Sequence, residues 1–383
     1  MNRLVIVGNG FDICCGLNTS YHSFINHYVT ECLKEGLKYE KPSHKGSFKH
    51  GLPFYNPKDD ALLQMKFGSQ AHNVDQILEY IKAEVKRKDP LNGSMTFYHL
   101  NAENSKGNAG TARLVVHYKS ELFYNSINRL NWSNIEAEYF KLLVKIYDEG
   151  KDIHFVEKLN KELQFIRGKL IQYIKDEAKR HKLNKKAKEQ IDFIKDKLIE
   201  PVSKDKIIEE ARGKVKIGSI QDTLILNFNY TEICHPYLTQ NEETYNVNIH
   251  GMKDNEEDIV FGYGDETDPR YKVLEQSGID EYLRHMKSPY YLTNPDFQVL
   301  RDFISSNFYE ITILGHSLGL SDRVLLKELF EHNNCISIRP FHRGSKEDFR
   351  KKSLSLTRHY DNKEEMRRKV VFDESAILNR ESE

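Results

Sequence analysis

The sequence predicts an α/β protein whose Rossmann-like parallel sheet is interrupted by a large, mainly helical insertion. Three observations favour this fold class. The chain opens with an apolar run at 4–7 that ends in the turn Gly8-Asn9-Gly10. Four similar short runs follow residue 220, and helix-like segments separate them. Short β-branched runs bounded by turn-forming residues are typical of strands buried on both faces of a parallel sheet.

The spacing of these strands divides the chain into four parts. Residues 1–39 carry the first strand and its glycine turn, and residues 40–220 form the insertion. Residues 221–344 complete the sheet, and residues 345–383 are a charged tail that we expect to be only partly ordered. The later strands are expected at 223–229, 245–250, 311–315 and 335–341.

Helix signals complete the core. A helix at 19–28 follows the glycine turn, with Asn18, Thr19 or Ser20 available as its N-cap. Another helix, with an apolar stripe from Leu325 to Phe330, begins at Ser321 or Asp322.

The insertion is expected to be irregular at first and helical later. Residues 40–115 read as loops around a helix at about 70–88. Ser133 and Glu136 form a capping box ahead of an amphipathic helix at 133–149. Residues 150–215 are rich in lysine and predict a helical hairpin or bundle. Two interpretations of that region stay open: a solvated helical face, or an arm for homo-oligomerisation or phage sensing.

Composition narrows the function classes. The 57 basic and 57 acidic residues cancel, so no global charge favours nucleic acid or a membrane surface. The five cysteines form no Cys-x-x-Cys pair, which predicts neither a zinc site nor a disulfide framework and fits a reducing compartment. No segment approaches the ~20 apolar residues of a transmembrane helix. We therefore expect a cytoplasmic protein with no metal and no membrane partner.

Polar residues at the predicted strand ends are the candidate ligand contacts. The turn Gly8-Asn9-Gly10 lets backbone N–H groups approach a phosphate, although a tight turn without a ligand explains it equally well. Asn229 and His250 each end a predicted strand, where α/β sheets place their ligands. The alternatives are Asn229 or Thr231 as a helix N-cap and His250 as a structural histidine.

The segment Gly315-His316-Ser317-Leu318-Gly319 matches the G-x-S-x-G nucleophile elbow of α/β-hydrolases. A serine hydrolase is disfavoured because the next helix does not begin directly after Ser317 and the chain beyond it is short. This alternative stays open, because acids and histidines follow in the required order: Asp322, Asp348, His332 and His342.

Taken in order, these clusters resemble the AbiH-like proteins of bacterial abortive infection. The matching motifs are GNGFD at 8–12, GLNTSY at 16–21, NFNYTE at 227–232, NIHG at 248–251, FGYGDE at 261–266 and GHSLGLSD at 315–322. The segment from Trp132 to Glu136 also looks like the family's W-x-x-x-E segment. The resemblance covers most of the chain and implies a role in antiphage defence.

More distantly, the chain resembles the sirtuin-like NAD-binding fold. That resemblance implies a phosphate side of an NAD site at Gly8, Asn9, Gly10 and Phe11, and an adenosine side at Gly315, Ser317 and Asp322. Asn229 and His250 correspond to the catalytic asparagine and histidine. Asp12 stands near a position where sirtuins carry a small hydroxyl residue. The zinc-binding cysteines of sirtuin deacylases are missing, which disfavours protein deacylation.

The resulting hypothesis is a defence protein that binds NAD or a related nucleotide and, once activated, hydrolyses its nicotinamide–ribose bond. Asn229 would position a water molecule, His250 would accept a proton, and Asp12 would bind ribose hydroxyls or stabilise positive charge. Asp322 can also be a plain helix cap. A phage-derived trigger is the partner that a defence role implies. A non-catalytic nucleotide-binding switch and a serine hydrolase that uses Ser317 are the alternatives.

Overall fold

The computed structural model describes residues 1–38, 54–55, 60–67, 96–103, 109–127, 132–200, 207–211, 213, 219–239, 243–251 and 259–378. The chain divides into two compact units. The first consists of Met1–Thr19 with Ile171–Glu383, and the second consists of Ser20–Leu170. Helix α6 (Ile153–Arg180) begins in the second unit and ends in the first.

A five-stranded parallel sheet with the order β7-β6-β1-β8-β9 forms the centre of the first unit. Its strands are β1 (Asn2–Val7), β6 (Thr223–Asn227), β7 (Thr244–Asn248), β8 (Tyr309–Leu314) and β9 (Cys335–Pro340). Later strands add outward from β1 in both directions, so the order reverses between β1 and β8. This topology is doubly wound and confirms the predicted Rossmann-like fold class.

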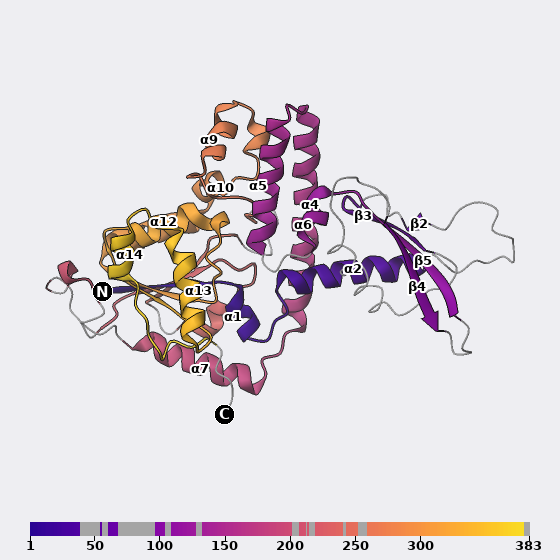
Figure 1. Ribbon diagram of the computed structural model, residues 1–383. Helices are drawn as coiled ribbons and strands as arrows, with labels where there is room; N and C mark the ends of the chain where they lie inside the picture. The colour runs from indigo at the N-terminus through magenta and orange to yellow at the C-terminus, as the bar shows by residue number, and fades with distance from the viewer. Residues whose placement is uncertain are drawn as a thin grey trace. The chain divides into compact units, whose positions relative to one another are not determined.

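Both faces of the sheet are buried because alternate residues of each strand face different helices. Leu4 and Ile6 of β1 belong to one apolar cluster, and Val5 and Val7 belong to another. The first cluster includes residues of α11 (Pro295–Ser306) and α12 (Arg323–Glu331). The second includes residues of α1 (Asn9–Cys14), α7 (Lys185–Ile199) and α8 (Cys234–Leu238). In Figure 1, α7 and α12 lie on opposite sides of this unit.

Shorter elements connect the strands and their helices. They are η2 (Glu209–Ala211), α9 (Pro269–Gln276), η4 (Asp280–Tyr282), α10 (Lys287–Thr293) and η5 (Leu320–Asp322).

The C-terminal region is folded over residues 345–378, contrary to the prediction of a tail that is at best partly ordered. It forms α13 (Lys346–Thr357) and α14 (Lys363–Lys369). Leu356 and Tyr360 are buried in the same cluster as Leu4 and Ile6. Val371 also donates its backbone N–H to Ile338 O of β9 at 2.9 Å. A few apolar residues among many charges are enough to attach this segment to the sheet.

The second unit contains a four-stranded antiparallel sheet with the order β2-β3-β5-β4. The strands are β2 (Phe54–Tyr55), β3 (Leu63–Phe67), β4 (Thr96–Glu103) and β5 (Ala109–Tyr118). The prediction of loops over 40–115 was therefore wrong in these segments, because glycine, asparagine and serine obscured the strand pattern. The helix expected at about 70–88 lies outside the described residues.

The described helices of the second unit are α2 (Tyr21–Lys38), α4 (Glu121–Ser126), α5 (Trp132–Asp148) and the first part of α6. Ser20 caps α2, because its Oγ accepts from the backbone N–H of Ser23 at 3.1 Å. Ser133 lies inside α5, so the predicted capping box is wrong. Helices predicted within 150–215 are present as α6 and α7.

Candidate functional site

The glycine turn after β1 contacts the loop after β8. The N–H of Gly8 donates to Leu314 O and that of Gly10 donates to Gly315 O, each at 2.9 Å. A Cβ added at Gly10 would lie 2.7 Å from Gly315 Cα. Gly315 itself has a φ of +70°, which favours glycine. Close backbone approach therefore accounts for these glycines, and their role as phosphate ligands stays a prediction.

Replacing Gly10 with alanine is expected to destabilise the protein by about 1–3 kcal/mol, because the new methyl group meets backbone that cannot rotate away. Urea denaturation measures the change. Gly168→Ala is the control, since nothing lies within 4 Å of a Cβ at that helical position. Alanine there should be neutral or stabilising by up to about 1 kcal/mol. Equal effects of the two changes would contradict the close-contact explanation.

Asp12 is the centre of a buried polar cluster. Its Oδ1 accepts from Asn229 Nδ2 at 2.8 Å, and its Oδ2 accepts from Thr231 Oγ1 at 2.7 Å. Neither Asn229 nor Thr231 caps α8, whose N-cap is Ile233. The predicted polar turn after β6 therefore folds onto α1 and holds its carboxylate.

Burial raises the pKa of Asp12 to about 7, although hydrogen bonds from Thr231, Asn229 and Thr19 favour the ionised form. The carboxyl group thus exchanges its proton near neutral pH. A group with this property at the carboxyl edge of a parallel sheet is a candidate for chemistry or ligand binding.

A second set of contacts joins the ends of β6 and β7. Asn227 Nδ2 donates to Asn248 Oδ1 at 2.9 Å, and Asn227 Oδ1 accepts from the N–H of Asn229 at 3.0 Å. His250 Nδ1 lies 3.1 Å from Phe228 O. Because a carbonyl only accepts, Nδ1 carries the hydrogen and Nε2 is the nitrogen that can accept a proton.

Asp322 connects His250 with a buried lysine that the sequence did not single out. Lys287 Nζ donates to Asp322 Oδ1 at 2.6 Å, and the two side chains are 1% and 7% exposed. His250 Nε2 lies 3.2 Å from the same oxygen, but without hydrogen-bond geometry. Burial alone would raise the pKa of Asp322, but the Lys287 ammonium beside it holds that pKa well below its usual range. Asp322 occupies the N-cap position of α12, but its side chain makes no cap hydrogen bond, so capping does not account for the buried carboxylate.

His316 lies on the other side of Asp322. Its Nε2 is 3.7 Å from Asp322 Oδ2, and its Nδ1 accepts from the N–H of Leu318 at 3.0 Å. Burial lowers the pKa of His316 to about 3, so this ring is neutral at physiological pH. Phe228 packs against both histidine rings, with its ring centroid 4.4 Å from that of His316 and 5.2 Å from that of His250.

The loop after β8 is not a nucleophile elbow. Ser317 is exposed, and the strained residue is Leu318, with a φ of +58°. Within the described part of the chain, no side chain makes a hydrogen bond with Ser317. The helix that follows, α12, begins only at Arg323. This geometry disfavours the serine-hydrolase alternative.

The structure thus brings Asp12, Asn229, His250 and Asp322 together in the first unit. Asn9 accepts from Thr19 Oγ1 through its side chain. Phe11 is buried in the apolar cluster below the turn, so its ring serves packing. Thr231 is part of the motif NFNYTE at 227–232, but its contact with Asp12 was not predicted. Lys287 lies in none of the motifs, so no sequence pattern indicated its role. Over the described ranges, no three His, Cys, Asp or Glu side chains gather as a metal site requires.

Among the helices with described residues, none combines the length and apolar character needed to cross a membrane. A family model described as Bacteriophage abortive infection AbiH matches residues 4–342. No curated protein and no solved structure matches the chain. The matched range covers both parts of the parallel sheet and every candidate site residue. The chain therefore belongs to the AbiH family of bacteriophage abortive infection.

Proposed function

We propose that this antiphage protein binds NAD or a related nucleotide at the carboxyl edge of its parallel sheet and cleaves the nicotinamide–ribose bond when activated. One observation carries the proposal: a continuous buried network joins side chains from the ends of β1, β6 and β7. Asp12 binds Asn229, and the carbonyl of the preceding residue, Phe228, binds His250. These are the residue types that this reaction needs.

The amide of Asn229 suits the positioning of a nucleophile. Its nitrogen donates to Asp12, which directs its oxygen away from the carboxylate. No described side chain donates to that oxygen, so it can accept from a water molecule or a ribose hydroxyl. Holding the water below C1′ makes attack effectively unimolecular.

Asp12 and Asp322 supply the negative charge that would stabilise the positive groups formed during the reaction. Cleavage passes through an oxocarbenium-like state, and nicotinamide leaves as a neutral molecule, so no strong general acid is required. Asp12, when ionised, stabilises the positive charge that develops on the ribose. His250 accepts a proton at Nε2, and Asp322 at 3.2 Å stabilises the resulting imidazolium.

The test follows free nicotinamide after the purified protein is mixed with NAD, and NAD content in cells during phage infection. Asn229→Ala and His250→Ala are expected to lower the rate by about 100-fold or more, as loss of a positioning or proton-transfer group does. His154→Ala is the control, because that histidine is exposed on α6. Binding of NAD without release of nicotinamide would favour the non-catalytic switch. Neither binding nor release would refute the proposal.

The serine-hydrolase alternative has its own measurement. A fluorophosphonate probe is expected to leave the protein unlabelled, because Ser317 lacks a described partner that could activate it. Labelling that disappears in Ser317→Ala would contradict this expectation and displace the NAD proposal.

A further inference from the structure

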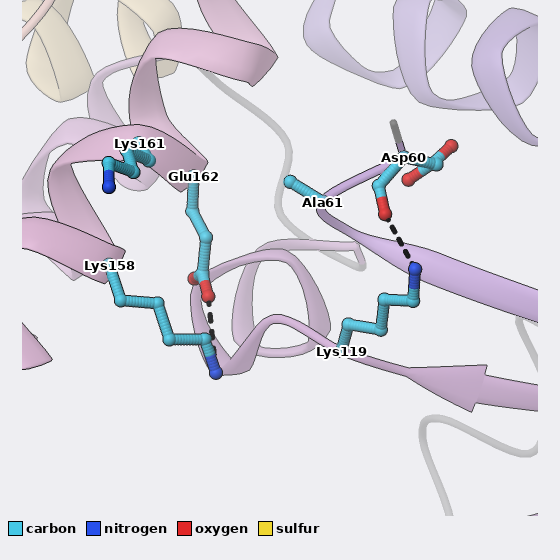
Figure 2. A pocket seen from close by; sticks show the side chains of 6 residues that line it. All are labelled: Asp60, Ala61, Lys119, Lys158, Lys161 and Glu162. Atoms are coloured by element: carbon cyan, nitrogen blue, oxygen red, sulfur yellow. Dashed lines mark hydrogen bonds and ion pairs between the residues drawn. The ribbon is translucent and has the colours of Figure 1, made fainter. Parts of the chain in front are cut away.

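The second unit contains a cavity of about 550 Å³ between the start of α6 and the ends of β3 and β5. Its lining includes Lys158, Lys161 and Glu162 on the helix, and Asp60, Ala61 and Lys119 on the other side (Figure 2). Ligand cavities of a few hundred Å³ accept molecules of metabolite size. Nothing in the proposed function uses this space.

Among the described residues that line the cavity, three are lysines and two are carboxylates. Lys119 Nζ binds the carbonyl of Asp60 at 2.8 Å, whereas the Asp60 carboxylate points away and accepts from Tyr28 Oη at 2.7 Å. Lys158 and Lys161 are three residues apart on α6, so they share a face of the helix. Lys161 is exposed and makes no ion pair with a described residue.

Glu162 provides a buried hydrogen-bond acceptor at the cavity. Its side chain is only 6% exposed. Its Oε2 accepts from Ser120 Oγ at 2.7 Å, and its Oε1 lies 3.7 Å from Lys158 Nζ, which is longer than a hydrogen bond. Burial raises the pKa of Glu162, although the hydrogen bond from Ser120 and the charge of Lys158 favour the ionised form. A ligand hydroxyl could donate a further hydrogen bond to Oε1.

We infer that this cavity binds a small phosphate-bearing molecule that also carries hydroxyl groups, of the pentose-phosphate class. The ammonium groups of Lys158 and Lys161 hold the phosphate, and Glu162 accepts hydrogen bonds from the hydroxyls. A carboxylate beside lysines discriminates against bare phosphate, since it repels an anion that offers no donor. The cavity is therefore a second ligand site, in a different unit from Asp12 and His250.

Calorimetric titration of the full chain with ribose 5-phosphate, inorganic phosphate and ribose tests this assignment. Ribose 5-phosphate is expected to bind more tightly than inorganic phosphate, and ribose most weakly. Lys161→Ala should weaken ribose 5-phosphate binding by about tenfold, the effect of losing one charge-assisted hydrogen bond. Lys169→Ala, an exposed lysine of the same helix, should leave it unchanged.

Glu162→Gln separates the two parts of the site. It is expected to strengthen inorganic phosphate binding and to reduce the preference for ribose 5-phosphate by several-fold. No heat at millimolar probe, or equal affinities in Lys161→Ala and Lys169→Ala, would overturn the inference. If the probe bound at the carboxyl edge of the parallel sheet instead, Lys161→Ala and Lys169→Ala would have equal affinities. The two variants therefore distinguish binding at this cavity from binding at the proposed NAD site.

Discussion

Replacing Lys287 with methionine is expected to lower the free energy of unfolding by about 3–5 kcal/mol. The ammonium is 1% exposed and lies 2.6 Å from Asp322 Oδ1. Methionine fills a similar volume, so the loss comes from the charge: the Asp322 carboxylate would stay buried beside His250 without its cation. Urea denaturation at pH 7 measures the change.

Two further variants establish the cause. Lys145 binds Glu121 at a similar distance, 2.8 Å, but the two side chains are 46% and 50% exposed. Lys145→Met should therefore cost at most about 1 kcal/mol. Adding Asp322→Asn to Lys287→Met should recover a large part of the lost stability, because no unpaired charge remains. If Lys287→Met lowered the free energy of unfolding no more than Lys145→Met does, the buried pair would stabilise the protein no more than an exposed pair.

The buried pair also bears on function. Taking two charges out of water costs more than an apolar pair would, so such a pair is weak evidence of selection for stability. Asp322 additionally faces His250 at 3.2 Å and His316 at 3.7 Å. We interpret Lys287 as a positioning residue that keeps Asp322 ionised and oriented toward His250.

The parallel sheet was predictable because its strands are continuous apolar runs that end in polar turns. Residues at those ends converge in any doubly wound sheet, which is why the closeness of the 228–229 turn to His250 could be predicted, whereas the roles of Asn229 and His250 stay predictions. The predicted strands extended one or two residues too far at some ends, since Asn229 belongs to the turn that reaches Asp12. Thr231, which also binds Asp12, was considered only as a possible N-cap of the next helix.

The burial of Lys287 could not be predicted, because it depends on the path that α9 and α10 take between β7 and β8. Lysine side chains usually lie on the surface. Lys287 is buried here because the fold places Asp322 beside it. The antiparallel sheet was missed for a different reason. In sequence, segments such as that of β4 alternate only weakly between apolar and polar residues and lie between stretches rich in glycine, asparagine and serine.

Asp12→Asn is expected to stabilise the protein above neutral pH while abolishing nicotinamide release. Burial raises the pKa of Asp12 to about 7 in the folded protein, from the ordinary aspartate value of 3.8. Between about pH 4 and pH 7 the folded state binds a proton that the unfolded state has lost, so stability falls as pH rises. Each unit of that interval is worth about 1.4 kcal/mol. Asparagine stays neutral and avoids the loss.

The two variants should therefore have similar stability near pH 4, and Asp12→Asn should exceed the wild type by a few kcal/mol near pH 8. Urea denaturation across this range measures the difference. Asp302→Asn, which removes an exposed carboxylate of α11, should follow the wild type. A constant difference between Asp12→Asn and the wild type at all pH values would refute the elevated pKa. Greater stability with no cleavage would mean that the protein keeps a costly buried carboxylate because its chemistry requires the charge.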